Sequence, residues 1–363
     1  MSKEKVLVIA EAGVNHNGSL KLAIELVDAA IAAGADIVKF QTFVAEELAS
    51  PQAKQAEYQT ANTNVEQSQL SMLKSLELSF EEHKKVQEYC QSAGIEYLST
   101  AFDFSSLNFL IEELQLKTLK IPSGELTNSP FVLAHAYTGC DLIVSTGMAN
   151  LEEIEFALMV IAFGLVHKDD KVKSPSIEAF RQAYESEQGV KLLREKVTLL
   201  HCTTEYPAPI DEVNLKAMDL MRSHFKLNVG YSDHTQGTII STAAVAAGAK
   251  VIEKHFTLSR ELEGPDHIAS IEPNELKEMI ENIRLIEKAL GSEVKSPTNS
   301  EQKNIAIARK SIVAKADIAK GDHFTESNLT IMRPGTGVSP TKFWQVIGNR
   351  APKSFKAGDL IEV

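Results

Sequence analysis

Two histidines stand where they could hold a metal ion, His234 in Tyr-Ser-Asp-His-Thr and His255 in Glu-Lys-His-Phe. Each follows an apolar run of the kind that forms a buried strand. A lone histidine is more often a core residue, but two at neighbouring strand ends can converge on one ion. No third His or Cys stands at zinc-like spacing. Two nitrogens completed by water and substrate oxygens therefore predict an exchangeable Mn²⁺ or Mg²⁺ site and not structural zinc.

Two lysines, Lys39 and Lys120, lie between apolar neighbours in otherwise buried runs. Most lysines at strand ends extend their ammonium groups into water. Here the apolar flanks favour inward-facing ammonium groups, which together with hydroxyls suit a phosphate and a carboxylate. The candidate hydroxyls follow other apolar runs, at Ser123, Ser145, Thr146 and Ser232. We therefore predict an anion-binding pocket inside a protein whose net charge is −12.

Eight short apolar runs alternate with amphipathic stretches up to about residue 290, and these elements must position the candidate residues. The runs are residues 6–10, 36–41, 95–100, 118–121, 142–145, 197–201, 227–231 and 250–253. Helix start and stop signals lie between them, such as Ser19 to Gly34 and Ser79 to Gly94. Strands separated by helices form parallel sheets, so the pattern predicts an α/β fold, a (β/α)₈ TIM barrel. Such barrels build their active sites where the strands end.

Two stretches are longer than a minimal barrel needs. Residues 44–75 are rich in Gln, Ala and Asn and follow the second predicted strand, so they are expected on the active face, where they could form a lid. Residues 164–196 are highly charged and precede the sixth predicted strand. We expect them on the opposite face, as a solvated elaboration.

The character of the chain changes after residue 290. Residues 291–304 are polar without an apolar period, which predicts a linker between a catalytic domain at 1–290 and a small β-rich domain at 305–363. Short strand and tight-turn signals fill the small domain, such as Ser311-Ile-Val-Ala and Lys356-Ala-Gly-Asp. Its size is near the lower limit for independent folding, so it is expected to pack against something larger.

Composition excludes several kinds of partner. The acidic net charge gives no basic footprint, so neither nucleic acid nor an anionic membrane surface is expected to be a partner. The apolar run at residues 6–10 is too short for a signal segment, and no run approaches the length of a membrane span. Three cysteines without a CxxC pair fit a reducing compartment. We therefore expect the protein in the cytoplasm.

The chain resembles the sialic acid (nonulosonic acid) synthase family over nearly its whole length. Many motifs match in the family's order, including Ala10-Glu-Ala-Gly-Val-Asn-His-Asn-Gly18, Val38-Lys-Phe-Gln-Thr42, Lys120-Ile-Pro-Ser-Gly-Glu125, Ser145-Thr-Gly-Met148 and Gly264-Pro-Asp266. The C-terminal segment resembles the family's antifreeze-like (SAF) domain, with Arg333-Pro-Gly-Thr-Gly337 at its sugar-contacting turn.

The resemblance implies a role for each matching residue. The catalytic set would be Glu11, Glu125, His234 and His255, of which the two histidines would hold manganese. Phosphoenolpyruvate would bind to Lys39, Thr100, Lys120, Ser123, Ser145, Thr204 and Ser232. An amino sugar would bind to Gln41, Glu125, Tyr206, Asp266 and a partner subunit's Arg333.

The resemblance also implies a reaction and an assembly. Phosphoenolpyruvate would condense with N-acetylmannosamine or 2,4-diacetamido-2,4,6-trideoxymannose, with addition of water and release of phosphate by C–O cleavage. The metal would polarise the sugar aldehyde so that the weakly nucleophilic C3 of phosphoenolpyruvate can attack it. Glu11 or Glu125 would relay protons. The protein would be a domain-swapped homodimer in which one subunit's small domain covers the other subunit's barrel.

Some features depart from the family pattern, and two other readings stay open. Thr204 stands where some members have Asn, and Glu205 and residues 164–196 look more like the bacterial legionaminate branch. One alternative is a phosphoenolpyruvate-dependent barrel synthase that acts on an aldose phosphate, for which only Lys254 offers an extra cation near the barrel mouth. The other is a non-catalytic glycan-binding protein, which the presence of both metal-binding histidines disfavours.

Overall fold

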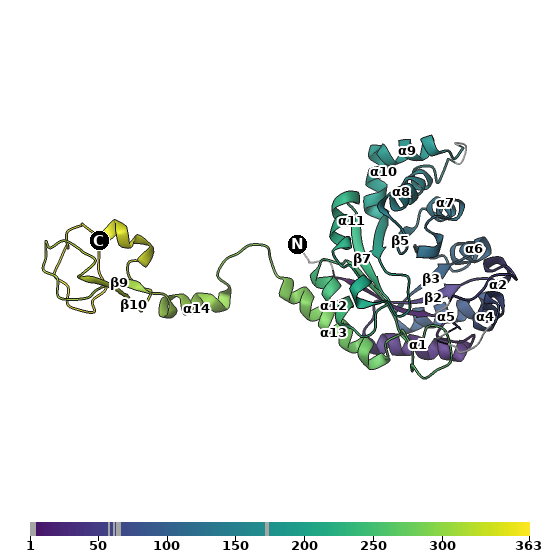
Figure 1. Ribbon diagram of the computed structural model, residues 1–363, viewed down its shortest axis with the longest axis horizontal. Helices are drawn as coiled ribbons and strands as arrows, with labels where there is room; N and C mark the ends of the chain where they lie inside the picture. Colours follow the sequence, from purple (N-terminus) through teal and green to yellow (C-terminus); the bar gives the residue numbers. More distant parts are fainter. Residues whose placement is uncertain (1–4, 57–58, 61, 63–66, 171–173) are drawn as a thin grey trace. The chain divides into compact units, whose positions relative to one another are not determined.

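The computed structural model describes residues 5–56, 59–60, 62, 67–170 and 174–363, in two compact units, Met1–Gly291 and Ser292–Val363 (Figure 1). Residues 57–58, 61 and 63–66 of the predicted lid and residues 171–173 of the predicted elaboration lie outside the described residues.

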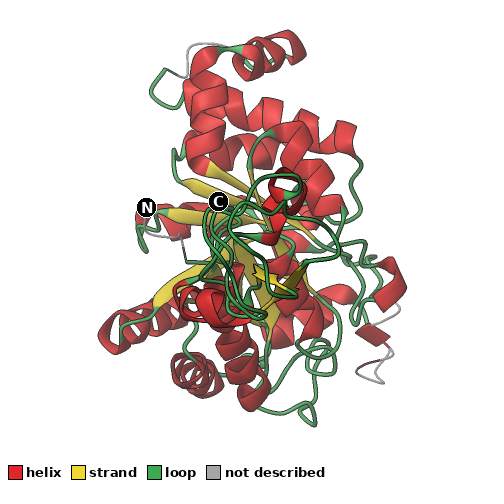
Figure 2. Cartoon of the chain, turned by 90° about the vertical axis from the view of Figure 1, so that its left-hand side faces the viewer, coloured by secondary structure: helices red, strands yellow, loops and turns green. Residues whose placement is uncertain are grey.

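Eight parallel strands of the first unit close into a barrel in chain order, because β1 pairs with both β2 and β8. They are β1 (Leu7–Gly13), β2 (Ile37–Thr42), β3 (Glu96–Ala101), β4 (Thr118–Ile121), β5 (Asp141–Ser145), β6 (Val197–His201), β7 (Asn228–Asp233) and β8 (Val251–His255). Helices surround the strands (Figure 2). The predicted (β/α)₈ barrel is confirmed, and every predicted run coincides with a strand to within a few residues.

The helices follow the strands, and their ends obey the signals in the sequence. They are α1 (Leu20–Ala33), α2 (Ala45–Leu48), α4 (Gln69–Leu76), α5 (Phe80–Ala93), α6 (Phe104–Glu112), α7 (Ser129–Tyr137), α8 (Leu151–Val166), α9 (Ile177–Glu185), α10 (Glu187–Lys196), α11 (Ala217–Phe225), α12 (Ile239–Ala246) and α13 (Pro273–Leu290), with short 3₁₀ turns at Ser123–Glu125 and Ile210–Glu212. Ser19 caps α1, which ends at Gly34 in the left-handed region (φ +84°). Ser79 and Glu82 form a capping box at α5.

An apolar layer fills the barrel interior below the pocket. It consists of Ile9, Ile37, Leu98, Ile143, Leu200 and Val251, with one residue from each of six strands. Side chains alternate along a strand, so the residue two positions later faces the same interior one layer higher. On β1, β2 and β8 this next layer is Glu11, Lys39 and Glu253, all nearly fully buried. The strand period thus places charged groups directly above the apolar layer.

Residues 164–196 differ from the expected solvated elaboration. They include two helices, α9 and α10, and α9 packs an apolar face against α8, where the rings of Phe180 and Phe163 lie 5.2 Å apart. The prediction was wrong because the charged residues 167–173 are followed by an apolar helical spacing at Ala179, Phe180 and Ala183, which are buried.

The second unit holds a small β-structure with its own core. Strands β9 (Ser311–Ala314) and β10 (Leu329–Met332) pair antiparallel, and isolated bridges such as Ile318 to Phe355 extend the pairing. A 3₁₀ turn (Pro340–Lys342) and α15 (Phe343–Val346) follow. Part of the predicted linker at 291–304 is helical, because α14 (Asn299–Ala308) begins there with a Thr298–Glu301 capping box. No helix in the described part of the chain is both long and apolar enough to cross a membrane.

Gly230 on β7 tests the barrel's close packing. A Cβ there would lie 2.4 Å from the Val251 carbonyl oxygen and 2.7 Å from Leu200 Cδ2. We predict that Gly230→Ala lowers the free energy of unfolding by about 1–3 kcal/mol, since the β7 and β8 backbones must separate. Chemical denaturation followed by circular dichroism measures this change. The matched control is Gly124→Ala, whose Cβ would meet nothing within 4 Å. Equal stability of the two variants would contradict the packing argument.

Candidate active site

A cavity of about 300 Å³ opens where the barrel strands end. Its lining includes most of the predicted site residues: Glu11, Lys39, Gln41, Thr100, Lys120, Ser123, Ser145, Thr204, Tyr206, Ser232, His234, His255 and Asp266. They come from all eight strands or the segments that directly follow them, so the barrel itself brings together residues that are far apart in sequence. Enzymes of this fold place their chemistry at this face.

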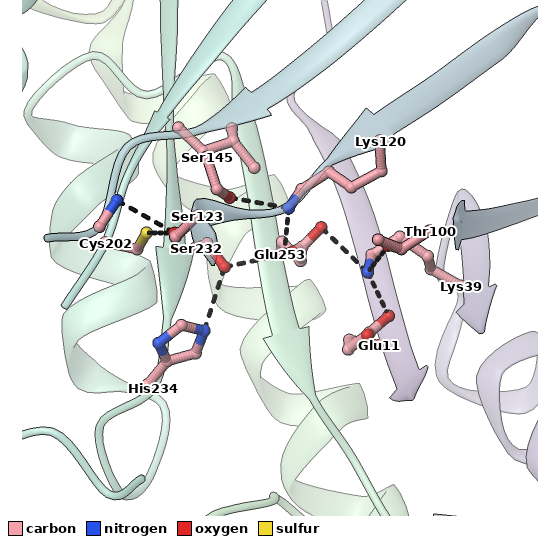
Figure 3. A network of polar contacts seen from close by, with 12 residues as sticks. Glu11, Lys39, Thr100, Lys120, Ser123, Ser145, Cys202, Ser232, His234 and Glu253 are labelled. Atoms are coloured by element: carbon pink, nitrogen blue, oxygen red, sulfur yellow. Dashed lines mark hydrogen bonds and ion pairs between the residues drawn. The ribbon is translucent and has the colours of Figure 1, made fainter. Parts of the chain in front are cut away.

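Glu253 lies at the centre of the polar network in the pocket (Figure 3). Its carboxylate is 3.5 Å from Lys120 Nζ and 3.6 Å from Lys39 Nζ, and it accepts a 2.8 Å hydrogen bond from Ser232 Oγ. Lys39 also pairs with Glu11 at 2.7 Å and donates to Thr100 Oγ1. One carboxylate therefore holds two ammonium groups side by side.

The buried charges shift one another's pKa values. Burial would raise the pKa of Glu253, but Lys120 and Lys39 outweigh it and lower that pKa to about 2. For Glu11 burial dominates over the attraction of Lys39 and raises the pKa to about 7. Burial lowers the pKa of Lys120, whereas the two carboxylates more than offset burial at Lys39 and raise its pKa. Because Glu11 takes up a proton near neutrality, the pocket can gain positive charge when an anion enters.

The two predicted metal ligands lie side by side at the ends of the neighbouring strands β7 and β8. The ring centroids of His234 and His255 are 5.6 Å apart, and the ring of Tyr206 lies 4.2 Å from that of His234, tilted by 32°. His234 Nδ1–H donates to the Thr203 carbonyl at 2.6 Å, since a carbonyl can only accept. Burial lowers the pKa of His234 to about 4 and that of His255 well below its usual value. Both imidazoles are therefore neutral at pH 7, as metal ligands must be.

A compact group of small donors lies beside Lys120. Gly147 N–H donates to Ser123 Oγ at 3.0 Å, and Lys120 Nζ donates to Ser145 Oγ at 2.7 Å. A Cβ at Gly147 would lie 2.2 Å from Thr204 Oγ1, so only glycine fits between these hydroxyls. The buried Thr204 hydroxyl has no hydrogen-bond partner among the described residues. An ammonium group, hydroxyls and a close backbone N–H are suitable ligands for a phosphate group.

Four of the candidate residues lie elsewhere. Glu125 does not line the pocket. It lies in a 3₁₀ turn, and its carboxylate accepts a 2.7 Å hydrogen bond from Asn128 Nδ2. Arg333 belongs to the second unit. Lys254 points to the outer side of β8, fully buried, and pairs with Asp233 at 3.1 Å. It supplies no cation to the mouth, contrary to expectation. Thr146 turns its hydroxyl to the Leu200 carbonyl at 2.9 Å.

Glu253 is a functional residue that the sequence pattern alone does not single out. The segment Glu253-Lys254-His255 stands at the end of an apolar run, where all three residues have the same polar character. Alternation along β8 separates its members, because Glu253 and His255 line the pocket while Lys254 does not. The alternation of inward and outward side chains along a strand is therefore the sequence signal that could have identified Glu253 as a pocket residue.

The fold and site define a barrel enzyme whose pocket holds two buried lysines, and comparisons with known proteins identify its family. The sequence profile of the NeuB family matches residues 26–295, and that of the SAF domain matches residues 309–362. The chain therefore belongs to the NeuB family and carries a SAF domain.

Named relatives cover nearly the whole chain. It is 49% identical over 358 residues to an N,N'-diacetyllegionaminic acid synthase of Campylobacter jejuni, covering 99% of each. It is 44% identical to the synthase of the same name from Legionella pneumophila, covering 98% of this chain and 92% of that one. The crystal structure of an N-acetylneuraminic acid synthetase from Leptospira borgpetersenii shares 32% identity with a TM-score of 0.66, covering 83% and 90%. The relatives' names agree with an enzyme built around the pocket.

Asp266 lines the pocket and gives a pH-dependent prediction. Burial raises its pKa from 3.8 to about 6. The carboxyl of Asp266 therefore loses its proton at a lower pH in the unfolded chain than in the folded one. The contribution of Asp266 to folding stability falls as the pH rises from 3.8 to about 6. Asp266→Asn cannot ionise, so its stability relative to the wild type should grow by roughly 1–1.5 kcal/mol from pH 5 to pH 8. Urea denaturation at both pH values measures the difference. Exposed Asp211→Asn is the control, and a shift of equal size in both variants would refute the assignment.

Proposed function

We propose that this protein is a nonulosonic acid synthase, which condenses phosphoenolpyruvate with an N-acetylmannosamine-type sugar aldehyde and water and releases phosphate. The observation that carries the proposal is the pair of lysines held by one carboxylate beside two neutral histidines. The names of the similar synthases support the product class. The aldose phosphate alternative loses its support because Lys254 is buried and paired with Asp233.

In the proposed complex, the anion occupies the lysine side of the pocket. Lys39 and Lys120 would hold the phosphate and carboxylate of phosphoenolpyruvate, with Ser123 and Ser145 donating hydrogen bonds. Ser232, also predicted to contact this substrate, donates its one hydroxyl proton to Glu253 and would act by holding that carboxylate. Glu253 fixes both ammonium groups before the substrate arrives, so little reorganisation is needed on binding. The C3 carbon would then face the sugar aldehyde near the histidines, and C2 would be left open to water.

Proton transfer is assigned to Glu11. Its pKa of about 7 lets the carboxyl take or give a proton near neutral pH, as a general acid or base should. Its carboxylate accepts a 3.4 Å hydrogen bond from Gln41 Nε2, a predicted sugar residue, and pairs with Lys39, a predicted phosphoenolpyruvate residue, which supports a role between the two substrates. Glu125 is less suited to this role, because its carboxylate is engaged by Asn128 outside the pocket lining.

A divalent metal fits the two histidines. His255 Nδ1 is a buried nitrogen without a hydrogen-bond partner among the described residues, and the Thr203 carbonyl leaves His234 Nε2 unprotonated. No group of three His, Cys, Asp or Glu side chains in the described ranges could hold a metal ion, so water and substrate oxygens would complete the shell. Mn²⁺ suits such a set, with Mg²⁺ or Co²⁺ as alternatives. When bound, the ion would polarise the aldehyde oxygen as a Lewis acid.

A domain-swapped homodimer in the cytoplasm completes the proposal. Exposed apolar side chains follow five of the strands around the pocket mouth, at Phe104, Met148, Ile210, Ile239 and Ile268. The small unit exposes Ile331 and Met332 directly before Arg333. That unit carries eleven Lys and Arg against seven Asp and Glu, so its net charge is +4. Since the whole chain has a net charge of −12, residues 1–291 have a net charge of −16. Complementary charge and apolar surface favour a SAF domain that docks on a barrel.

The proposed function is tested by phosphate release from phosphoenolpyruvate with Mn²⁺ and each amino sugar, with mass spectrometry of the product. We predict that His255→Ala lowers condensation by roughly a hundredfold or more, because metal polarisation contributes several kcal/mol to the reaction. His135→Ala is the control, because His135 is also a buried histidine but does not line the pocket. Its imidazole donates a hydrogen bond to the Phe131 carbonyl. Undiminished turnover of the His255 variant, or of wild type after exhaustive chelation, would refute the metal assignment.

Mixed dimers test the swapped arrangement. We predict that Arg333→Ala raises the KM of the amino sugar and leaves that of phosphoenolpyruvate nearly unchanged. The mixing assay uses an amino-sugar concentration far below the KM of the Arg333→Ala chain, where neither variant alone turns over appreciably. Mixing the Arg333→Ala and His255→Ala chains, with subunit exchange verified, should then restore up to about a quarter of wild-type activity, because half of the dimers are mixed and each has one intact site. If Arg333 acts on its own barrel, the mixture is no more active than the two chains assayed separately. Arg350→Ala should behave as wild type in both assays.

A further inference from the structure

The turn after β1 carries Asn15 and Asn17, two residues of the Ala10–Gly18 motif that do not line the pocket. Asn15 is almost fully buried, although its amide is strongly polar. The side chains of both residues contact residues 256–272, the segment that joins β8 to α13. This segment carries Asp266 into the pocket lining. The two asparagines therefore connect the end of the first barrel strand to the segment that follows the last one.

Asn15 closes the base of this segment. Its Nδ2 group donates to the Phe256 carbonyl at 2.8 Å and to Ser270 Oγ at 2.9 Å, so one amide joins both ends of the segment. Ser270 Oγ donates in turn to the Asp266 carbonyl at 2.7 Å. A chain of two hydrogen bonds thus runs from Asn15 to the backbone of Asp266.

Asn17 holds the middle of the segment. Its Nδ2 donates to the Glu263 carbonyl at 2.8 Å, and its Oδ1 accepts from His267 Nε2 at 3.2 Å, because an amide oxygen can only accept. A Cβ at Gly264 would lie 2.9 Å from Asn17 Oδ1 and 2.6 Å from His267 Cδ2, so the segment packs directly on these two side chains. Asn17 therefore contacts residues that precede and follow Asp266 in the sequence.

The carboxyl of Asp266 depends on this backbone for its direction. It lines the pocket and is almost fully buried. Burial is the only influence that raises its pKa, so no charged group or hydrogen-bond donor among the described residues fixes the carboxyl. Asn62, in the segment after β2, donates a 2.7 Å hydrogen bond to the neighbouring Pro265 carbonyl. Side chains thus hold the backbone on which Asp266 stands, and its carboxyl remains available to a ligand.

We infer that Asn15 and Asn17 are positioning residues that direct the Asp266 carboxyl toward the amino sugar. The inference rests on the proposed function, since Asp266 is a predicted sugar-binding residue of the same site. A carboxylate accepts from a sugar hydroxyl or amide only at a suitable distance and angle, so a backbone shift of about 1 Å weakens the contact. Phosphoenolpyruvate should be little affected, because Lys39 and Lys120 lie on β2 and β4.

The test is a double-mutant cycle in steady-state kinetics, with N-acetylmannosamine or 2,4-diacetamido-2,4,6-trideoxymannose, whichever wild type turns over faster. Asn17→Ala should raise the KM of the sugar by roughly tenfold, as expected when a hydrogen bond to a charged group is weakened. Both kcat and the KM of phosphoenolpyruvate should change by less than about threefold. Asp266→Ala should raise the sugar KM at least as much. In the Asp266→Ala background, Asn17→Ala should change the sugar KM by less than about twofold, because coupled residues are not additive.

Asn214→Ala is the matched control. Asn214 and Asn17 share a φ of 49°, and the Asn214 amide also donates to a backbone carbonyl, that of Glu212 at 3.0 Å. Asn214 follows β6 and does not line the pocket, so its loss should leave both KM values unchanged. Asn17→Asp is a second, isosteric variant. It keeps the acceptor for His267 and loses the donor to Glu263, so it should also raise the sugar KM, whether or not the alanine variant folds.

Equal rises in both KM values, or the full effect of Asn17→Ala in the Asp266→Ala background, overturn the inference while the synthase proposal stands. Absence of phosphate release by wild type with either sugar overturns the proposed function itself. The position of Asp266 then remains measurable through the stability difference between wild type and Asp266→Asn at pH 5 and pH 8. This difference should shrink when both chains also carry Asn17→Ala, because water then reaches the carboxyl. An unchanged difference shows that Asn17 does not position Asp266.

Discussion

The pocket depends on the burial of two ammonium groups against one carboxylate. Moving Lys39 and Lys120 out of water is costly, and each would lose its proton or its position without a counter-charge. Glu253 lies within 3.6 Å of both, and Ser232 orients it. An arrangement of this kind adds little to folding stability. Its effect is to hold positive charge at a fixed place inside a protein of net charge −12.

The barrel supplies this arrangement through its two-residue period. An apolar layer at Ile9, Ile37 and Val251 seals the interior, and the next inward positions carry Glu11, Lys39 and Glu253. The same alternation sends Lys254 to the outer side of β8, where it pairs with Asp233. Asp233 also accepts hydrogen bonds from Thr235 and Ser241, so the turn that carries His234 is fixed from behind. Inner and outer faces of β7 and β8 therefore cooperate, with the outer pair holding the backbone that presents the histidines.

Much of this could be predicted from sequence because it depends on local periods. Apolar runs separated by capped helices gave the barrel, and polar residues after each run gave the pocket lining. Residues whose direction depends on a turn or on tertiary contacts were not predictable in this way. Glu125 is diverted by a 3₁₀ turn and Asn128, and Lys254 by strand alternation that the motif concealed. The pocket lining by Leu48 and Leu73 was not predictable either, because these residues come from separate helices whose packing brings them to one cavity.

Two parts of the molecule line the pocket: a charged floor on the strands, with Lys39, Lys120 and Glu253, and the segments that follow β2 and β3, with Leu48 and Leu73. The floor belongs to the strands, where a one-residue shift would turn every side chain to the other face, so its charge arrangement is tied to the fold. Substitutions at Leu48 or Leu73 leave the strand register untouched, because both residues lie outside the strands. Loops on a fixed barrel can change without disturbing the residues that the strands present. Change in what the pocket accepts is therefore expected first in the segments after β2 and β3, with the lysines, Glu253 and both histidines unchanged.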